Sequence, residues 1–579
     1  MNQPATPLTR TLRPLLLAAL LGLSTSLALA EAPDDGPIDL LLLGGTVITM
    51  DGEHPEAEAV AVRGRHIAEV GTAEALRELA GSGTRIIDLD GGVLIPGFIE
   101  GHGHLLGFGE ALMILDLSDT TSWQQIVERV AEAAETAEPG TWIRGRGWHQ
   151  ERWDPKPATT FDGVATHHAL SEASPDNPVL LTHASGHGSM VNARTLELAG
   201  IDRDSADPEG GTIVRDDRGE PTGFLRQAAQ NAAREAFARS ESDMSEADRQ
   251  ARFERQVELA GEEALRHGVT SFHDQGLNFE AIDRLRELAG RDALPVRLHV
   301  AVRDETNADM AERLGDYRMI GHGNQFLTVR AIKRQIDGAL GTHGAWLLSP
   351  YADNPDTAGL PQTPVEALRE TAEIALEHGF QLNTHAIGDR GNREALDIYE
   401  ALLGESDDDL RWRIEHAQNL HPDEVPRFAA LGVVASMQGV HATSDGPWVP
   451  QRLGEQRARE RAYVWRSLID ADAIICNGTD VPVESISPIA SFHASVTRRM
   501  ANGEYFFPEQ AMNRHEALAS YTINCARAVF EEDQLGSITP GKLADLVVLD
   551  RNPLTATDSE LAETRVQTTI IDGEIRYQR

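Results

Sequence analysis

The sequence predicts an α/β fold: a closed barrel of eight parallel strands, a small β domain made from both chain ends, and an insertion after the first barrel strand. Three observations predict it. In the middle of the chain, runs of strand type alternate with long helical runs rich in Ala, Glu and Arg, which is typical of βα units. Both ends carry short strands separated by Gly-containing turns. The interval between the first two barrel strands is far longer than one helix requires.

Residues 1–30 predict a cleavable signal peptide. Arg10 and Arg13 precede an apolar run over 15–23, and the small residues at 28–30 suit a cleavage site. An uncleaved membrane anchor is the alternative, but the run is short for a span of ~20 residues. We therefore expect a mature chain that is periplasmic or secreted, with no stable membrane association.

Residues 31–95 and 531–579 are expected to form the two parts of one β domain. Strands are predicted over 40–43, 46–50, 59–62 and 66–70 in the first part, and over 544–549 and 568–571 in the second. Asp572-Gly573 is typical of a hairpin turn. We predict that the two parts pair with each other beside the barrel.

The barrel is assigned to residues 96–530, with an insertion over about 105–266. Eight runs of strand type supply the number of strands that closes such a barrel, and they lie at 93–100, 269–273, 296–301, 326–333, 381–385, 413–416, 433–438 and 473–478. Active sites of these barrels form at the carboxyl ends of the strands. Residues that directly follow each run are therefore the candidates for chemistry.

Net charge and cysteine content exclude some classes of partner and site. The chain has 52 basic and 91 acidic residues, for a net charge of −39, and this field repels a phosphate backbone. Nucleic acid is excluded as a partner, whereas a small-molecule substrate and a homo-oligomer both stay possible. Cys476 and Cys525 are the only cysteines, too few for a disulfide framework or a Cys-based zinc site. One bridge between them stays possible.

Ligand-type side chains follow several of the barrel strands. His102 and His104 end the first, and side chains at i and i+2 of an extended chain face the same way, so both imidazoles can reach one ion. Lys333 ends the fourth strand and is one of only three lysines. A buried lysine can lose its proton and react as an amine, which arginine cannot. Carbamylation by CO2 would make it a carboxylate able to bridge two metals.

His385, His416 and Asp480 follow the fifth, sixth and eighth strands. Each has a structural alternative: a packed histidine, a turn, or a helix cap. The His-x-His pair and the lysine can also arise by chance. Such coincidences would have to recur at one face of the barrel, and this order of residues therefore favours a metal centre.

The order of these residues resembles the metal-dependent amidohydrolase superfamily. The surrounding phrases resemble its amidohydrolase 3 branch, which includes N-substituted formamide deformylases, and they lie at 268–271, 333–338, 385–392, 413–418, 478–483 and 541–546. The resemblance runs from about residue 39 to the end. It implies a distorted (β/α)8 TIM barrel beside a β-sandwich built from both chain ends.

The resemblance also implies a ligand set and a reaction. His102, His104 and Asp480 would hold one metal, His385 and His416 a second, and carbamylated Lys333 would bridge them. Two zinc ions are expected, with manganese or iron possible. The implied activity is that of a hydrolase that cleaves a non-peptide C–N bond of a small molecule, with Asp480 moving the proton.

The sequence also offers candidate substrate contacts and is compatible with other functions. Trp148, His187, His273 and Gln438 are candidates for contact with substrate, and His441 belongs with them. Each has a structural alternative, which for Trp148 is a tryptophan packed in a core. The same metal site could act on an ester, a lactone or another C–O bond. A non-catalytic periplasmic binding protein is the third possibility, because fold alone does not establish function.

Overall fold

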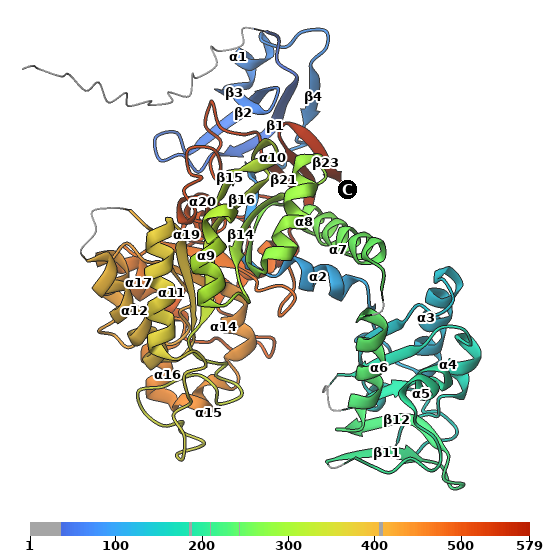
Figure 1. The fold of residues 1–579 in the computed structure, drawn as a ribbon. Coiled ribbons are helices and arrows are strands. Elements are labelled where there is room, and N and C mark those ends of the chain that lie inside the picture. The colour runs from blue at the N-terminus through green and yellow to red at the C-terminus, as the bar shows by residue number, and fades with distance from the viewer. Residues whose placement is uncertain (1–35, 162, 185–187, 209, 243, 405–408) are drawn as a thin grey trace, which may run out of the picture.

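The computed structural model describes residues 36–161, 163–184, 188–208, 210–242, 244–404 and 409–579. Three sheets organise this part of the chain: an eight-stranded sheet from both chain ends, a six-stranded sheet in the insertion, and a nine-stranded sheet whose main path forms the barrel (Figure 1). The predicted signal peptide lies outside the described residues. None of the described helices is both long and apolar enough to cross a membrane.

Eight parallel strands form the barrel, as predicted. They are β6 (Phe98–Gly103), β13 (Val269–Leu277), β14 (Arg297–Val302), β16 (Leu327–Gln335), β17 (Gln381–Ala386), β18 (Arg413–His416), β19 (Val434–Gln438) and β20 (Ile475–Gly478). Two backbone hydrogen bonds close the ring between its last and first strands. The amide of Asp480 donates to the His102 carbonyl at 2.7 Å, and the amide of His104 donates to the Val481 carbonyl at 2.8 Å. The barrel therefore closes where the candidate ligands lie.

Helices follow the barrel strands and cover them. They are α8 (Phe279–Gly290), α9 (Asn307–Tyr317), α11 (Val365–His378), α12 (Asp389–Leu403), α13 (Val425–Ala430), α14 (Gly439–Asp445), α15 (Val449–Leu453), α16 (Glu455–Arg461), α17 (Trp465–Asp470), α18 (Pro488–Thr497), α19 (Arg514–Ser520) and α20 (Ile523–Ala528). α8 shows the local cause: Asn278 caps its first turn by accepting from the amide of Ala281. Ile282 and Leu285, three residues apart, are then buried against the barrel. Beside this ring, β15 (Met319–Gly321) pairs with β16, followed by the short α10 (His322–Gln325).

The run at 93–100, predicted as one strand, is two strands in different sheets. β5 (Val93–Pro96) belongs to the sheet of the chain ends and β6 to the barrel. Gly97 separates them, and a Cβ atom at this position would lie 2.1 Å from Oγ1 of Thr270. The chain thus crosses between domains at a point where the neighbouring strand leaves room only for glycine.

The two chain ends share one sheet, which confirms that they pair. Its strands are β1 (Leu40–Ile48), β2 (Glu56–Arg63), β3 (His66–Gly71), β4 (Arg85–Asp88), β5, β21 (Leu546–Leu549), β22 (Val566–Ile571) and β23 (Glu574–Gln578). Two short helices also belong to the chain ends: α1 (Ala73–Arg77) packs on this sheet, whereas α21 (Asp558–Ala562) packs against α18 of the barrel. β21 pairs antiparallel with β5. Leu40 and Leu42 from one end pack with Leu546 and Ile570 from the other in one apolar core.

The insertion forms its own sheet and core. Its elements are β7 (Leu115–Asp116), α3 (Trp123–Thr136), β8 (Ile143–Trp148), α4 (His168–Ala173), β9 (Val179–His183), β10 (Gly188–Val191), α5 (Ala193–Ala199), β11 (Gly211–Arg215), β12 (Pro221–Gln227) and α6 (Gln230–Ser242). It stands beside the barrel, joined to it through α2 (Leu105–Leu112) and α7 (Glu246–Arg266) (Figure 1). These two helices pack closely, since a Cβ atom on Gly109 would lie 2.1 Å from the Gln256 carbonyl oxygen.

Cys476 and Cys525 form a disulfide that joins β20 to α20. The bridge packs behind β6, where a Cβ atom on Gly101 would lie 2.5 Å from Sγ of Cys476. It therefore supports the strand that carries His102.

Candidate metal centre

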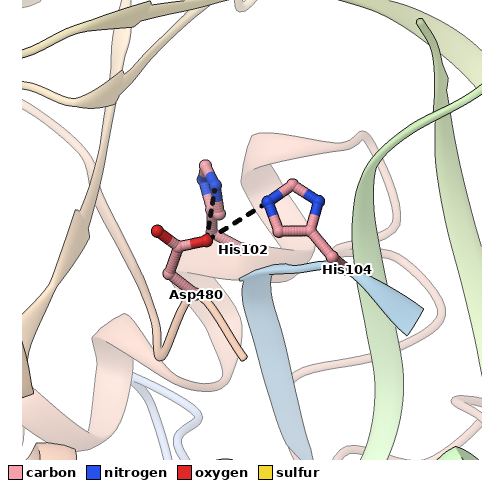
Figure 2. A group of neighbouring side chains, drawn as sticks. All are labelled: His102, His104 and Asp480. Atoms are coloured by element: carbon pink, nitrogen blue, oxygen red, sulfur yellow. Dashed lines mark ion pairs between the residues drawn. The ribbon is translucent and has the colours of Figure 1, made fainter. Parts of the chain in front are cut away.

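Three side chains meet where the barrel closes. His102, at the end of β6, is 1% exposed, and His104 lies at the N-cap position of α2. Their Nε2 atoms lie 3.5 and 3.2 Å from Oδ1 of Asp480, which follows β20 (Figure 2). Two imidazoles and a carboxylate that converge at this range form a group able to bind a divalent metal.

A second group of donors shares the same carboxylate. Donor atoms of His416, His441 and Asp480 all lie within 4.8 Å of one another. His416 ends β18, and His441 lies on α14. The ring of His385 is 4.6 Å from that of His416, while its Nε2 atom lies 3.8 Å from Oδ1 of Asp337. His416 thus groups with His441 here, whereas the family resemblance paired it with His385.

Unsatisfied buried nitrogens indicate that this region fits a metal. The Nε2 atoms of His102, His385 and His441 are buried and form no hydrogen bond within the described part of the chain. Buried polar atoms in folded proteins nearly always have a partner, and an ion is one explanation for those that lack one. Imidazole nitrogens that share a carboxylate are the donor set that zinc prefers.

The protonation states of these groups suit metal binding. Burial lowers the pKa of His102 and His385 well below the usual value, and that of His416 to about 3. These imidazoles are therefore neutral near pH 7. Burial opposes ionisation of Asp480, but the hydrogen bond from His104 and the nearby His416 outweigh it and lower its pKa to about 2. The carboxylate is ionised.

Lys333 lies among these groups. It is 4% exposed on β16, and it lines the same cavity as the histidines. Burial lowers the pKa of its amine to about 8, against the nearby carboxylates of Glu415 and Asp480, which raise it. An appreciable fraction of this amine is thus neutral near pH 7, the form that reacts with CO2.

Two further side chains contact the candidate ligands. Oε2 of Glu415 accepts a short hydrogen bond from Nδ1 of His102, and Oε1 pairs with Nε of Arg413 at 2.7 Å. Gln438 Oε1 lies 2.7 Å from Nδ1 of His416. A partner on Nδ1 fixes the ring and its tautomer, which leaves Nε2 as the nitrogen that could bind a metal. The role of Glu415 was not predicted from the sequence.

The donor groups open into a cavity of about 390 Å³. Its walls include the apolar side chains of Leu340, Ile387, Trp448 and Val483. This volume and lining suit a small molecule with an apolar part.

The remaining candidates lie elsewhere or outside the described residues. Trp148 is fully buried in the insertion, where its Nε1 donates to the Leu181 carbonyl at 2.9 Å. His273 is buried in the barrel, with Nδ1 3.3 Å from a guanidinium nitrogen of Arg413. Neither is among the described residues that line the cavity. His187 lies outside the described residues, and Gln438 contacts His416 rather than the cavity wall.

Glu415→Gln is expected to weaken metal binding ~10- to 100-fold, because an amide holds the His102 ring less firmly than a carboxylate. Chelator competition on the metal-loaded protein measures this. The change also leaves Arg413 without its buried partner, so thermal unfolding must be recorded in parallel. Gln438→Glu, which keeps an acceptor for His416, serves as the matched control. Unchanged metal affinity in a folded Glu415→Gln protein contradicts the orienting role.

Known proteins resemble this chain over most of its length. The model of the Amidohydrolase family matches residues 85–577. Protein LONG AFTER FAR-RED 3 of Arabidopsis thaliana is 33% identical over 530 residues, covering 89% of this chain and 87% of its own. The N-substituted formamide deformylase of Arthrobacter pascens is 29% identical over 566 residues, covering 93% and 98%.

A solved structure shares the fold. The crystal structure of an uncharacterized metal-dependent hydrolase from Pyrococcus horikoshii OT3 has a TM-score of 0.70 and 26% identity, covering 90% of this chain and 99% of its own. The barrel, the sheet of both ends and the family match agree with one another. This chain belongs to the amidohydrolase family and is a hydrolase.

Proposed function

We propose that the protein hydrolyses a non-peptide amide bond of a small molecule with the help of two divalent metals. The observation that carries the proposal is the Asp480 carboxylate, which two groups of histidines share inside one cavity. The similarity to an N-substituted formamide deformylase supports a C–N bond as the target.

The residues present fit such a centre. His102 and His104 would hold one ion, and His416 the other, with Asp480 between them. His385 and His441 are further donors for the second ion, and a carbamate on Lys333 would add a bridging carboxylate. We propose zinc as the metal, because histidine and carboxylate are its usual ligands. When bound, such ions lower the pKa of water toward ~7 and polarise the substrate carbonyl.

Side chains of this protein then complete the reaction. The Asp480 carboxylate accepts the proton of the attacking water and returns it to the nitrogen of the leaving amine. A C–O bond to the carbonyl carbon forms first, and the C–N bond breaks once the nitrogen has received the proton, which gives a carboxylic acid and an amine. Leu340, Ile387 and Trp448 hold the apolar part of the substrate and exclude bulk water from the cavity.

Purified protein is expected to contain about two divalent ions per chain and to lose hydrolysis when a chelator removes them. The test is elemental analysis, followed by an assay of N-alkylformamides, N-alkylacetamides and matched esters before and after zinc is restored. We expect the amides to be turned over and zinc to restore at least half of the activity.

The outcomes separate the parts of the proposal. Metal content near zero, with no activation by zinc, manganese or cobalt, rules out the metal centre. Turnover of the esters alone, on metal-loaded protein, keeps the centre and rules out amide hydrolysis.

A further inference from the structure

Arg303 brings a positive charge to the wall of the metal cavity. It directly follows β14, at the barrel face where the candidate ligands lie, and it lines the cavity together with Lys333 and His385. Its charge acts on both neighbours, lowering the pKa of each alongside the larger effect of burial. A cation at this place is costly for a site that is to hold metal ions, so it needs an explanation.

The guanidinium of Arg303 has little to bind within the protein. Among the described residues its one ion pair is with the adjacent Asp304, at 3.6 Å, and that carboxylate is 75% exposed, so the pair contributes little. No hydrogen bond to the guanidinium is found among the described residues. Elsewhere the chain pairs such groups tightly: Arg297 lies 2.8 Å from Asp545, and Arg413 lies 2.7 Å from Glu415.

The stem of Arg303 is nevertheless held in place. Gly276, at φ +130°, faces it, and a Cβ atom there would lie 2.3 Å from the Cβ atom of Arg303 and 2.6 Å from its Cδ atom. The glycine in β13 therefore leaves the space that the aliphatic part of the Arg303 side chain occupies. A packed stem whose head group is only weakly paired loses less rotamer freedom when it binds a ligand.

Acidic groups of the cavity do not neutralise Arg303. Asp445 is engaged by the Tyr463 hydroxyl at 2.6 Å and by Nε2 of Gln418 at 3.1 Å. Glu484, which follows β20 in the sequence, also lines the cavity. Neither forms an ion pair with Arg303 in the described structure. The planar guanidinium of Arg303 has two N–H groups that can donate to the two oxygens of one carboxylate.

We propose that Arg303 binds a carboxylate of the substrate, so that the enzyme acts on N-acyl compounds whose amine portion carries an anionic group. This inference rests on the proposed amide hydrolysis and narrows its substrate class. Arg303 sets specificity, while Asp480 and the metal donors carry out the bond cleavage. A carboxylate at that position satisfies the guanidinium, and the scissile amide extends from it toward the donor groups.

The test compares two formamides that differ in one terminal group. N-formyl-γ-aminobutyrate ends in a carboxylate where N-butylformamide ends in a methyl group. On metal-loaded enzyme, Arg303→Gln is expected to raise KM for the anionic compound ~10- to 100-fold, the usual loss for a charged hydrogen-bonded contact. kcat should change much less, and the kinetics of the neutral compound should stay unchanged. N-formylglycine and N-formyl-β-alanine then measure the best spacing.

Controls distinguish the possible causes. Arg303→Lys keeps the positive charge but lacks the paired N–H groups of a guanidinium, and it should recover part of the preference for the anionic compound. Asp304→Asn removes the existing ion pair and should leave the preference intact. An equal loss for both compounds in Arg303→Gln overturns the proposal, because it indicates a role in catalysis instead. If neither compound is turned over, the proposed function fails, and calorimetry of the same pair decides: equal affinities for wild type and Arg303→Gln overturn the assignment.

Discussion

Asp480→Asn is expected to lower kcat by ~10²- to 10⁴-fold, the usual contribution of general acid–base help. Asparagine keeps the shape of the side chain and removes its basicity, so the water proton has no acceptor. The low pKa of Asp480, about 2, means that the wild-type carboxylate is ionised near neutral pH, which is the form that can accept a proton. Steady-state kinetics with metal content measured on the same sample checks this.

A matched variant keeps the interpretation specific. Asp445 is a second carboxylate at the same cavity, but Tyr463 and Gln418 engage it. Asp445→Asn should therefore retain kcat within ~10-fold, since it removes no proton acceptor for the reaction. If Asp480→Asn retains its metals and turns substrate over within a few-fold of wild type, another group carries the proton.

Lys333→Ala is expected to lower activity more than ~100-fold. Removing a residue that only hydrogen-bonds to a metal ligand costs up to ~100-fold, and loss of a ligand itself should cost at least as much. Lys333→Arg should be equally inactive, because a guanidinium cannot form a carbamate and brings a positive charge against the metals. Short carboxylates such as acetate should restore part of the activity of the alanine variant by occupying the vacated position. Kinetics and elemental analysis of both variants measure the effect.

A conservative change elsewhere provides the comparison. Lys542 is a partly buried lysine that does not line the cavity, and its Nζ donates to the backbone carbonyls of Glu532 and Leu535. Lys542→Arg should preserve activity. Full activity in Lys333→Arg would show that Lys333 does not act as a carbamate.

The barrel could be predicted because its signal is repeated along the chain. Buried parallel strands are continuous apolar runs, and eight of them alternate with helices, so an error in one boundary does not change the fold. The break at Gly97 was missed because β5 and β6 are both apolar and adjacent, and only the close approach of Thr270 shows why glycine separates them. The shared sheet of both ends followed from their similar strand patterns.

The donor groups were predicted in part, for a geometric reason. His102, His104 and Asp480 follow strand ends, where position alone indicates the functional face. Glu415 precedes His416, and strict alternation would turn their side chains to opposite faces. His416 has φ 75°, outside the extended region, so both can serve the site. His441 lies on a helix after its strand, and no residue pattern indicates the direction of its ring.

The sheet shared by both chain ends has a consequence for synthesis. One edge of β5 pairs with β21, and β21 follows the whole barrel in the sequence. This edge therefore stays unpaired until the barrel has been synthesised. At ~5–20 residues per second, that interval lasts roughly tens of seconds on the ribosome. During this time β5 presents an open, apolar edge, the kind of surface on which nascent chains associate wrongly. The edge of β5 can therefore be covered only after translation has passed β21, and the sheet is complete only after β23. Any chain terminated before β21 would keep that edge exposed to chaperones and proteases.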